Sequence, residues 1–281
     1  MGSIFYIRKN MENLIKKLLQ NFSDQEILCK IECLFPKKSV LCKDAKEKGK
    51  NRKILYKQNL LDPAIFALDL QASFHAQNLW NKESFAFGLC IGDGYLNKRG
   101  ILTIQHSLKD KGFLFWKFYM CKRFGFLTEK SRPIRVINVN KRRSSVYISY
   151  RFNTRSIFQK EREIFYKNGV KTLPLNILKF YNWQVLALWF MDDGGRGANT
   201  PLGFVLDISS FAGQAFSFKN LFFEGFGLET SLHFHNRQKG IIKVYFKKKS
   251  VDKFVSNLYP YIIPSLKYKI AKKNENLFFL V

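Results

Sequence analysis

The chain has few acidic residues and no long hydrophobic run. Asp and Glu together number 21 in 281 residues, whereas Lys and Arg number 48, so the formal net charge is +27. No apolar run approaches the roughly 18 residues that a membrane-spanning helix needs. The stretch SIFYI at residues 3–7 is too short for the hydrophobic region of a secretory signal. We therefore expect no membrane-spanning helix and no secretory signal.

Cysteine is also scarce. The five cysteines are odd in number and lack the paired spacing of zinc sites, so we expect reduced thiols rather than a disulfide framework or a zinc centre. The sequence offers no Ser-His-Asp or Cys-His arrangement, and a covalent protein intermediate is therefore not expected.

Positive charge is what the chain has in excess, interleaved with Tyr, Phe, Asn and Ser. A polyanion is the natural partner, because each neutralised phosphate releases a counterion. Charge alone also fits ribosomal-type RNA binding or binding to a membrane surface. The 46% hydrophobic content indicates a globular fold. The 29 phenylalanines, with abundant Lys, Asn and Ile, are typical of AT-rich coding, so we expect a mitochondrial or chloroplast origin.

Residues 1–80 differ in composition from the rest. The run from 37 to 58 is rich in lysine and has no apolar face, so we interpret it as a loop or linker, with a DNA-tracking arm as the alternative. We expect a chain trimmed to about residue 75 to fold without this segment, because the regular pattern begins later.

From residue 81 onward, helix-like and strand-like segments occur twice in the same order. The first copy opens with ESFAFGLCIGDGYL (83–96) and the second with NWQVLALWFMDDGG (182–195). Strands and helices follow in each, with the first closing helix expected over 154–169. We therefore predict an N-terminal extension with a basic linker over 1–80, halves over 81–170 and 171–281, and a linker between the halves at about 168–180.

Each copy ends its apolar helix on carboxylates, Asp93 in the first and Asp192 with Asp193 in the second. A helix C-terminus already carries partial negative charge, so each carboxylate there is unfavourable by roughly 0.3–1 kcal/mol. A divalent cation held by carboxylate and carbonyl oxygens would offset this charge. The alternative is an exposed Asp-Gly turn, which the repetition disfavours. Gly194 and Gly195 are expected to end the second helix in the left-handed conformation.

The two stretches resemble the signature helices of the LAGLIDADG homing endonucleases, in the monomeric, intron-encoded branch. Further stretches that resemble this branch are KTLP (171–174), VLDISSF (205–211) and YPYIIPSLKYKI (259–270). The resemblance covers about 80–271. It implies an α+β fold of two pseudo-symmetric α-β-β-α-β-β-α halves, with saddle-shaped antiparallel sheets and two packed central signature helices. Gly88 and Gly92 would let those helices approach closely.

By this resemblance, the helix ends bring Asp93 and Asp193 together beside two scissile phosphates. There they would hold two or three Mg²⁺ ions, which activate water and stabilise the leaving oxygen. Gly92 and Asp192 would contribute only backbone carbonyls to the metals.

The resemblance also implies roles for other residues that match the family pattern by position. Lys171 and Lys269 would stabilise developing phosphate charge or position water, and Gln105 matches a water-positioning residue. Its counterpart in the second half is Asp207, where an acid replaces the usual amide. This difference leaves open whether Asp207 adds a metal contact or reduces activity.

Strand alternation predicts the DNA-facing side chains. The alternating set comprises Thr103, Gln105, Ser107, Tyr147, Ser149, Arg151, His233, His235, Lys243, Tyr245 and Lys247. The side chains on the opposite face of these strands are expected to pack under the helices; they are Val146, Ile148, Tyr150, Ile242, Val244 and Phe246. Further predicted DNA contacts are Lys141, Arg142, Arg143, Arg196, Asp207, Ser209 and Lys239. Reading His233 and His235 as a metal pair is disfavoured, because third and fourth ligands are missing.

We interpret the protein as a site-specific endonuclease of intron homing that cuts both strands of a long, asymmetric DNA target as a monomer. No membrane partner is expected. The alternative is a maturase, in which the same scaffold binds its own intron RNA with little or no nuclease activity. The carboxylate pair favours the nuclease. A structural ribosomal protein would explain the charge but not the buried helices with acidic ends.

Overall fold

The computed structural model divides into two units, with the boundary between Ala72 and Ser73. It describes residues 79–140, 145–174, 181–197, 203–236 and 240–270. Nearly all of the expected extension over 1–80 lies outside these residues, so that division stays a prediction. Within the described ranges, no helix has the length and apolar character to cross a membrane.

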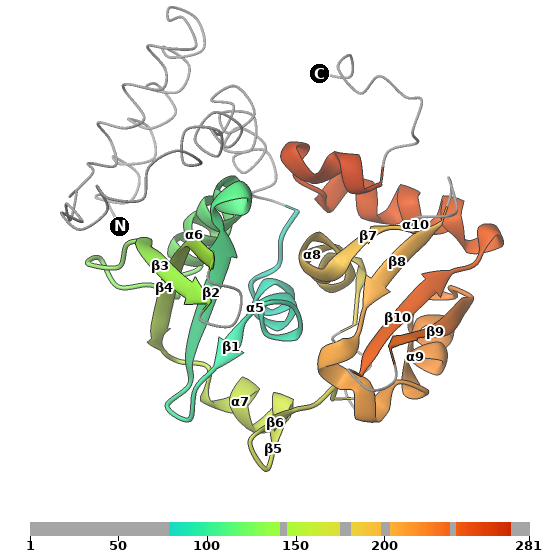
Figure 1. The fold of residues 1–281 in the computed structure, drawn as a ribbon, viewed down its shortest axis with the longest axis horizontal. Coiled ribbons are helices and arrows are strands. Elements are labelled where there is room, and N and C mark those ends of the chain that lie inside the picture. The colour runs from blue at the N-terminus through green and yellow to red at the C-terminus, as the bar shows by residue number, and fades with distance from the viewer. Residues whose placement is uncertain (1–78, 141–144, 175–180, 198–202, 237–239, 271–281) are drawn as a thin grey trace, which may run out of the picture. The chain divides into compact units, whose positions relative to one another are not determined.

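The first half begins with one of the two central helices and continues into a four-stranded antiparallel sheet (Figure 1). Its elements are α5 (Lys82–Ile91), β1 (Tyr95–Leu96), β2 (Ile101–Ser107), η3 (Leu108–Asp110), α6 (Lys111–Arg123), β3 (Ile134–Asn140), β4 (Ser145–Ser156) and α7 (Gln159–Phe165). The strand order is β1-β2-β4-β3, so β1 and β3 are the edge strands.

The second half repeats this plan. Its elements are α8 (Trp183–Asp193), β7 (Gly194–Arg196), β8 (Phe204–Asp207), η5 (Ser209–Gln214), α9 (Ser217–Phe226), β9 (Thr230–Asn236), β10 (Ile241–Phe246), η6 (Lys248–Ser250), α10 (Val251–Leu258), η7 (Tyr259–Tyr261) and η8 (Pro264–Lys269). The strand order, β7-β8-β10-β9, matches that of the first sheet position for position. The prediction of two pseudo-symmetric α-β-β-α-β-β-α halves is confirmed.

A short hairpin joins the halves. Strands β5 (Tyr166–Lys167) and β6 (Val170–Lys171) pair antiparallel. Asn168 and Gly169 form the turn with φ values of 51° and 79°. An Asn-Gly pair suits this turn because both positions need the left-handed region, which these residues tolerate best.

Asparagine side chains start both central helices and link them. Asn81 Oδ1 accepts from the backbone N–H of Glu83 at 2.7 Å, and Asn182 Oδ1 accepts from Val185 N–H at 3.1 Å. Each therefore satisfies a donor that the first helical turn leaves free. Asn182 Nδ2 also donates to Ser84 Oγ at 2.8 Å. The two helices thus begin at one shared network.

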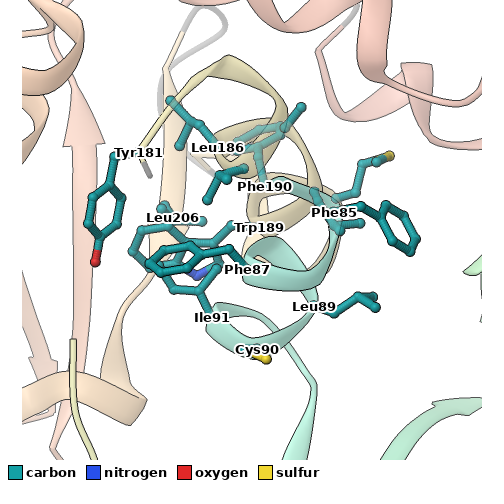
Figure 2. Close-up of a cluster of buried hydrophobic side chains, with 14 of the residues drawn as sticks. Phe85, Phe87, Leu89, Cys90, Ile91, Tyr181, Leu186, Trp189, Phe190 and Leu206 are labelled. Carbon is teal, nitrogen blue, oxygen red and sulfur yellow. The ribbon is translucent and has the colours of Figure 1, made fainter. Parts of the chain in front are cut away.

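The central helices α5 and α8 pack against each other along apolar faces (Figure 2). Residues Ser84–Ile91 of the first and Val185–Met191 of the second are all buried. A Cβ added at Gly88 would lie 2.9 Å from Leu188 Cδ2, so glycine permits the close approach. The expected role of Gly88 is confirmed, and Cys90 lies in this core as a free, buried thiol.

Two local expectations were wrong. Gly194, at the end of α8, has φ −89° and ψ 160° rather than the left-handed conformation, because the chain runs directly into β7. Glycine is needed there for a different reason, since a Cβ would overlap the Phe190 ring. The first closing helix begins at Gln159 rather than at 154, because strand β4 continues through Ser156.

Candidate active site

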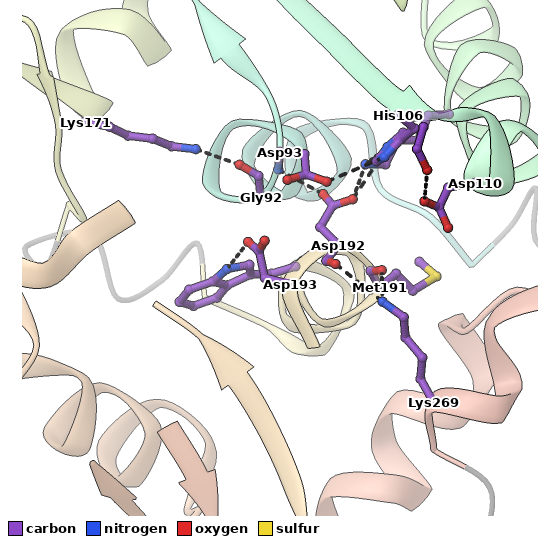
Figure 3. A network of polar contacts seen from close by, with 12 residues as sticks. Gly92, Asp93, His106, Asp110, Lys171, Met191, Asp192, Asp193 and Lys269 are labelled. Atoms are coloured by element: carbon purple, nitrogen blue, oxygen red, sulfur yellow. Dashed lines mark hydrogen bonds and ion pairs between the residues drawn. The ribbon is translucent and has the colours of Figure 1, made fainter. Parts of the chain in front are cut away.

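The carboxylates lie where the two central helices end side by side (Figure 3). Asp93 follows Gly92, the C-cap of α5, and Asp192 and Asp193 are the last residues of α8. Asp192 Oδ2 accepts from the backbone N–H of Asp93 at 3.2 Å. A Cβ on Gly92 would overlap this carboxylate. The Asp192 side chain therefore fills the space that Gly92 leaves between the helices.

A buried lysine from α6 pairs with Asp192. Lys117 Nζ donates to Asp192 Oδ1, and both side chains have 0% of their surface exposed. Lys117 Nζ also lies 3.0 Å from Nε2 of His106. A buried ion pair needs additional hydrogen bonds to offset its desolvation. Here the imidazole and the Asp93 backbone provide them.

His106 connects this pair to Asp93. Its Nδ1 lies 3.5 Å from Asp93 Oδ2. Burial, and then the positive charge of Lys117, lower the pKa of His106 to about 3, against the opposing effect of Asp93. The imidazole is therefore neutral, with Nε2 accepting from Lys117 and the Nδ1–H facing the Asp93 carboxylate.

Sequence reasoning missed both Lys117 and His106. Lys117 sits in the run FLFWKFYM, where it is the one charge among apolar residues. His106 shares the buried parity of β2 with Leu102 and Ile104. Each was a polar residue at a position that the apolar pattern assigns to the core, and that mismatch was the available signal.

Lys171 and Lys269 bind the carbonyl ends of the two helices. Lys171 Nζ donates to Gly92 O at 2.6 Å, and Lys269 Nζ donates to Met191 O at 2.6 Å and to Asp192 O at 3.4 Å. Burial lowers the pKa of both lysines, while the nearby carboxylates oppose this shift. The two ammonium groups offset the negative helix ends. Each carbonyl oxygen keeps a second lone pair for another partner.

The remaining carboxylates are crowded. Burial raises the pKa of Asp193 to about 8, with further increases from the charges of Asp192 and Asp93, although Trp189 Nε1 donates to Asp193 Oδ2 at 3.1 Å. Burial and Asp192 also raise the pKa of Asp93. Burial, and then the negative charge of Asp192, thus disfavour the charged forms of both carboxylates.

Carboxylate and carbonyl oxygens at the helix ends are the donors that could hold a divalent cation. Ligand atoms of Asp93, His106 and Asp192 all lie within 4.8 Å of one another, the one such cluster among the described residues, and this cluster does not include Asp193. Carboxylate oxygens are the donors that Mg²⁺ prefers. Lys117 already pairs with Asp192, so Asp93 offers the freer carboxylate, with 42% of its side chain exposed.

Gln105 and Asp207 occupy corresponding strand positions but make different contacts. Gln105 Nε2 donates to Ser149 Oγ at 2.8 Å. Asp207 Oδ1 accepts from the backbone N–H of Ser209 at 2.9 Å, which binds this carboxylate to the start of η5. Asp207 is not a member of the acidic cluster. Its metal contact stays a prediction.

The predicted DNA-facing parity agrees with the burial of β2. Thr103, Gln105 and Ser107 are partly exposed and alternate with buried neighbours. Ser149 differs from the expectation, because it is only 1% exposed and lies on β4, between β2 and β3 in the sheet. Its hydroxyl is therefore not accessible to a groove of DNA. Arg151, in register with Gln105, is partly exposed.

On the second sheet, the side chains predicted to face DNA include three aromatic rings that lie close together. His233 and His235 are exposed, and their rings lie 4.3 Å and 5.9 Å from that of Tyr245. Ile242, Val244 and Phe246 are buried as expected, whereas Ile148 and Tyr150 on β4, which were expected to be buried too, are only partly buried. Of the other predicted contacts, Lys243, Arg196 and Ser209 are partly exposed and Lys247 is exposed. Predicted contacts outside the described residues are Lys141, Arg142, Arg143, Lys239 and the side chain of Tyr147.

Comparison with known proteins identifies relatives of this arrangement. The model of the LAGLIDADG DNA endonuclease family matches residues 83–254. The chain is 22% identical over 208 residues to the cytochrome b mRNA maturase bI2 of Saccharomyces cerevisiae, covering 67% of this chain and 47% of that protein. It thus spans about half the length of that maturase. It is 32% identical over 133 residues to the intron-encoded endonuclease ai4 of Dictyostelium discoideum, covering 45% of this chain and 77% of the relative.

A solved structure shares the fold. The homing endonuclease I-WcaI bound to its DNA recognition sequence superposes with a TM-score of 0.58 and 23% identity, covering 82% of this chain and 97% of I-WcaI. This similarity supports the two-half architecture described above.

Proposed function

Because the chain belongs to the LAGLIDADG DNA endonuclease family, we propose that it is a site-specific endonuclease that hydrolyses both strands of DNA with divalent metal ions. The observation that carries the proposal is the crowding of Asp93 and Asp193 at the ends of the packed helices, where burial, and then the charge of Asp192, raise both pKa values. A protein that used this scaffold only for binding would not need these unfavourable charges.

Each carboxylate has a distinct setting in the proposed reaction. Asp93 and Asp193 would hold the Mg²⁺ ions, two or three in number, and bound Mg²⁺ would supply a nucleophilic water and stabilise the leaving oxygen. Asp193 is oriented by Trp189, which donates to its Oδ2 at 3.1 Å. Asp93 is oriented by the His106 imidazole, 3.5 Å from its Oδ2.

The side chain of Asp192 has a structural role in this proposal. Its Oδ1 pairs with Lys117 and its Oδ2 with the Asp93 backbone, so both oxygens are engaged within the protein. Its backbone carbonyl, near Lys269 Nζ, remains available to a metal. Lys171 and Lys269 hold positive charge at the helix ends, where it would attract and orient the phosphates.

The two sheets supply the proposed DNA surface. Their partly exposed faces carry polar, basic and aromatic side chains on strands that flank the carboxylates. The I-WcaI structure is of a homing endonuclease on its DNA recognition sequence, which supports the same use here. Because the two halves differ in sequence while sharing one chain, the proposed target is long and asymmetric, and the proposed functional form is a monomer.

A maturase is the second candidate function. Proteins named cytochrome b mRNA maturase bI2 match at 22% identity in Saccharomyces cerevisiae and at 28% in Debaryomyces hansenii. We propose intron RNA as an additional partner, bound by the same basic surface. The composition, typical of AT-rich coding, and the intron-encoded relative support an organellar origin.

Cleavage of a plasmid library with randomised inserts tests the nuclease. The full chain with Mg²⁺ is expected to linearise a subset of plasmids, whose sequenced ends define the target. Asp93→Asn or Asp193→Asn should abolish cutting while leaving target affinity largely intact. Asp252→Asn, on α10, is the matched control and should cut normally. Full cutting by either site variant would refute the assignment, and intron RNA binding without any DNA cutting would favour the maturase.

A further inference from the structure

An exposed tyrosine lies two residues after the first carboxylate. Tyr95 begins β1, two residues after Asp93, so the two Cα atoms lie within about 7 Å. The Tyr95 side chain is 60% exposed. Tyr95 pairs with Thr103 across the β1–β2 ladder, and directly opposed residues project to the same face of a sheet. The ring therefore lies on the face that carries Thr103, Gln105 and Ser107.

The strand that carries Tyr95 is anchored by residues of α7 and β5. Leu96 N–H donates to Tyr166 Oη at 3.3 Å, and Leu96 O accepts from Arg162 Nη1 at 3.0 Å. The Arg162 guanidinium lies 3.6 Å from the Tyr166 ring centroid. These contacts satisfy the open side of an edge strand, which otherwise leaves backbone groups unpaired. Tyr95 is thus exposed on a backbone that is held in place.

The ring itself is braced rather than covered. The rings of Tyr95 and Tyr166 meet edge to face, with centroids 6.4 Å apart and planes at 88°. A pre-positioned aromatic ring loses little conformational entropy when it contacts a partner. An exposed but braced ring beside the site is suited to contact a ligand.

The second half has no such side chain. Gly195 follows two residues after Asp193 and pairs with Val205 in β8, as Tyr95 pairs with Thr103 in β2. A Cβ at Gly195 would meet no atom within 4 Å, so the position is open. The pseudo-symmetric surface is therefore asymmetric beside the two carboxylates.

We propose that Tyr95 is a specificity-determining residue that contacts sugars and base edges next to the phosphate cut at Asp93. Its ring provides apolar contact with a sugar or a thymine methyl group, and its hydroxyl provides a hydrogen bond to a base or phosphate. Gly195 leaves the mirror-related base pairs uncontacted. This inference rests on the proposed nuclease function, and it makes the centre of the target directional.

The test uses the target that the full-length protein selects, with the base pairs at and between its two cuts randomised in a plasmid pool. Tyr95→Ala should shift base preference on one side of the target centre by about tenfold, the scale of losing one aromatic contact, and leave the mirror-related positions unchanged. Tyr95→Phe separates the ring from the hydroxyl and should retain the apolar part of the preference. Phe223→Ala, an exposed aromatic on α9, is the control and should keep the wild-type profile.

A gain of preference provides the reciprocal test. Gly195→Tyr should create a new base preference at the mirror-related positions, because that position has room for a side chain. If wild-type protein cuts its target while Tyr95→Ala keeps the same base profile, the inference is wrong and the nuclease assignment stands. If wild-type protein cuts no plasmid, both are wrong. Thermal melting of each variant separates loss of folding from loss of preference.

Discussion

The buried pair of Lys117 and Asp192 allows a quantitative prediction. Both side chains have 0% of their surface exposed, so solvent screening does not weaken the pair. Lys117→Met keeps the length of the side chain but leaves a buried carboxylate without its cation. Asp192→Asn leaves a buried ammonium with a neutral partner. Each single substitution should destabilise the fold by about 3–5 kcal/mol, a large part of the about 5–15 kcal/mol that holds a domain folded.

The double variant separates pairing from burial. Lys117→Met with Asp192→Asn removes both charges and nearly preserves both shapes, so its stability should lie within about 1 kcal/mol of the wild type. The coupling energy of the cycle is then about 5 kcal/mol or more. In thermal melting the single variants should lose on the order of 10 °C and the double variant should recover most of it.

Urea unfolding of the full chain measures the cycle, with surface pair Lys247 and Glu229 as the matched control. That pair has side chains 50% and 31% exposed, so Lys247→Met with Glu229→Gln should show no measurable coupling. Because the Asp192 carboxylate has a structural role in the proposed site, the double variant should still cut DNA. Single variants as stable as the wild type would refute the buried pair, and a stable double variant without cleavage would make the Asp192 side chain a metal ligand.

Three further outcomes are expected. DNA affinity should fall by on the order of 10³-fold between low and moderate salt if about six or more phosphates are neutralised, and a flat log–log slope in fluorescence anisotropy would contradict this. Without divalent ions, the free energy of unfolding should fall as pH rises from about 4 to about 8. The reason is that the pKa of Asp193 is raised from 3.8 to about 8, so the folded state favours its protonated form. Asp193→Asn should flatten this slope, and Mg²⁺ should raise stability at pH 8. In thermal melting, Gly88→Ala should cost about 1–3 kcal/mol, and Gly92→Ala should cost more, because its Cβ would overlap the Asp192 carboxylate rather than approach Leu188 Cδ2 at 2.9 Å.

Periodic features of the sequence predicted the fold well. The apolar stretches that end at Asp93 and Asp193 form the central helices, and the alternating runs form matching sheets. Both signals are local, because burial on every side of a helix and on one side of a strand leaves its mark on residue order. The repetition then indicated pairing of the halves, since each helix needs an apolar partner.

Contacts that depend on one specific neighbour could not be read in the same way. Ser149 has the parity of an exposed residue, yet it lies on a central strand and is covered. The ion-pair partner of Lys117 is not in its own helix but is Asp192, 75 positions later in the chain. Periodicity reports which face a residue occupies, whereas pairing across a core depends on how elements meet.

The pairing of Gly92 with Asp192 shows why the two halves cannot be chemically identical. These residues hold equivalent positions at the ends of α5 and α8, and a side chain on Gly92 would overlap the Asp192 carboxylate. The space between the helix ends therefore accommodates a single side chain. Once Asp192 fills it, its charge requires a cation, which Lys117 supplies from the first half alone.

This asymmetry extends to the residues that orient the two carboxylates. On the first side His106 faces Asp93, and on the second side Trp189 donates to Asp193. A neutral imidazole and an indole differ in the protons and space they offer, so the two carboxylates meet different surroundings. In the proposed nuclease, the two strands would then be cut at different rates, because close packing at the pseudo-symmetry axis leaves no room for a symmetric site.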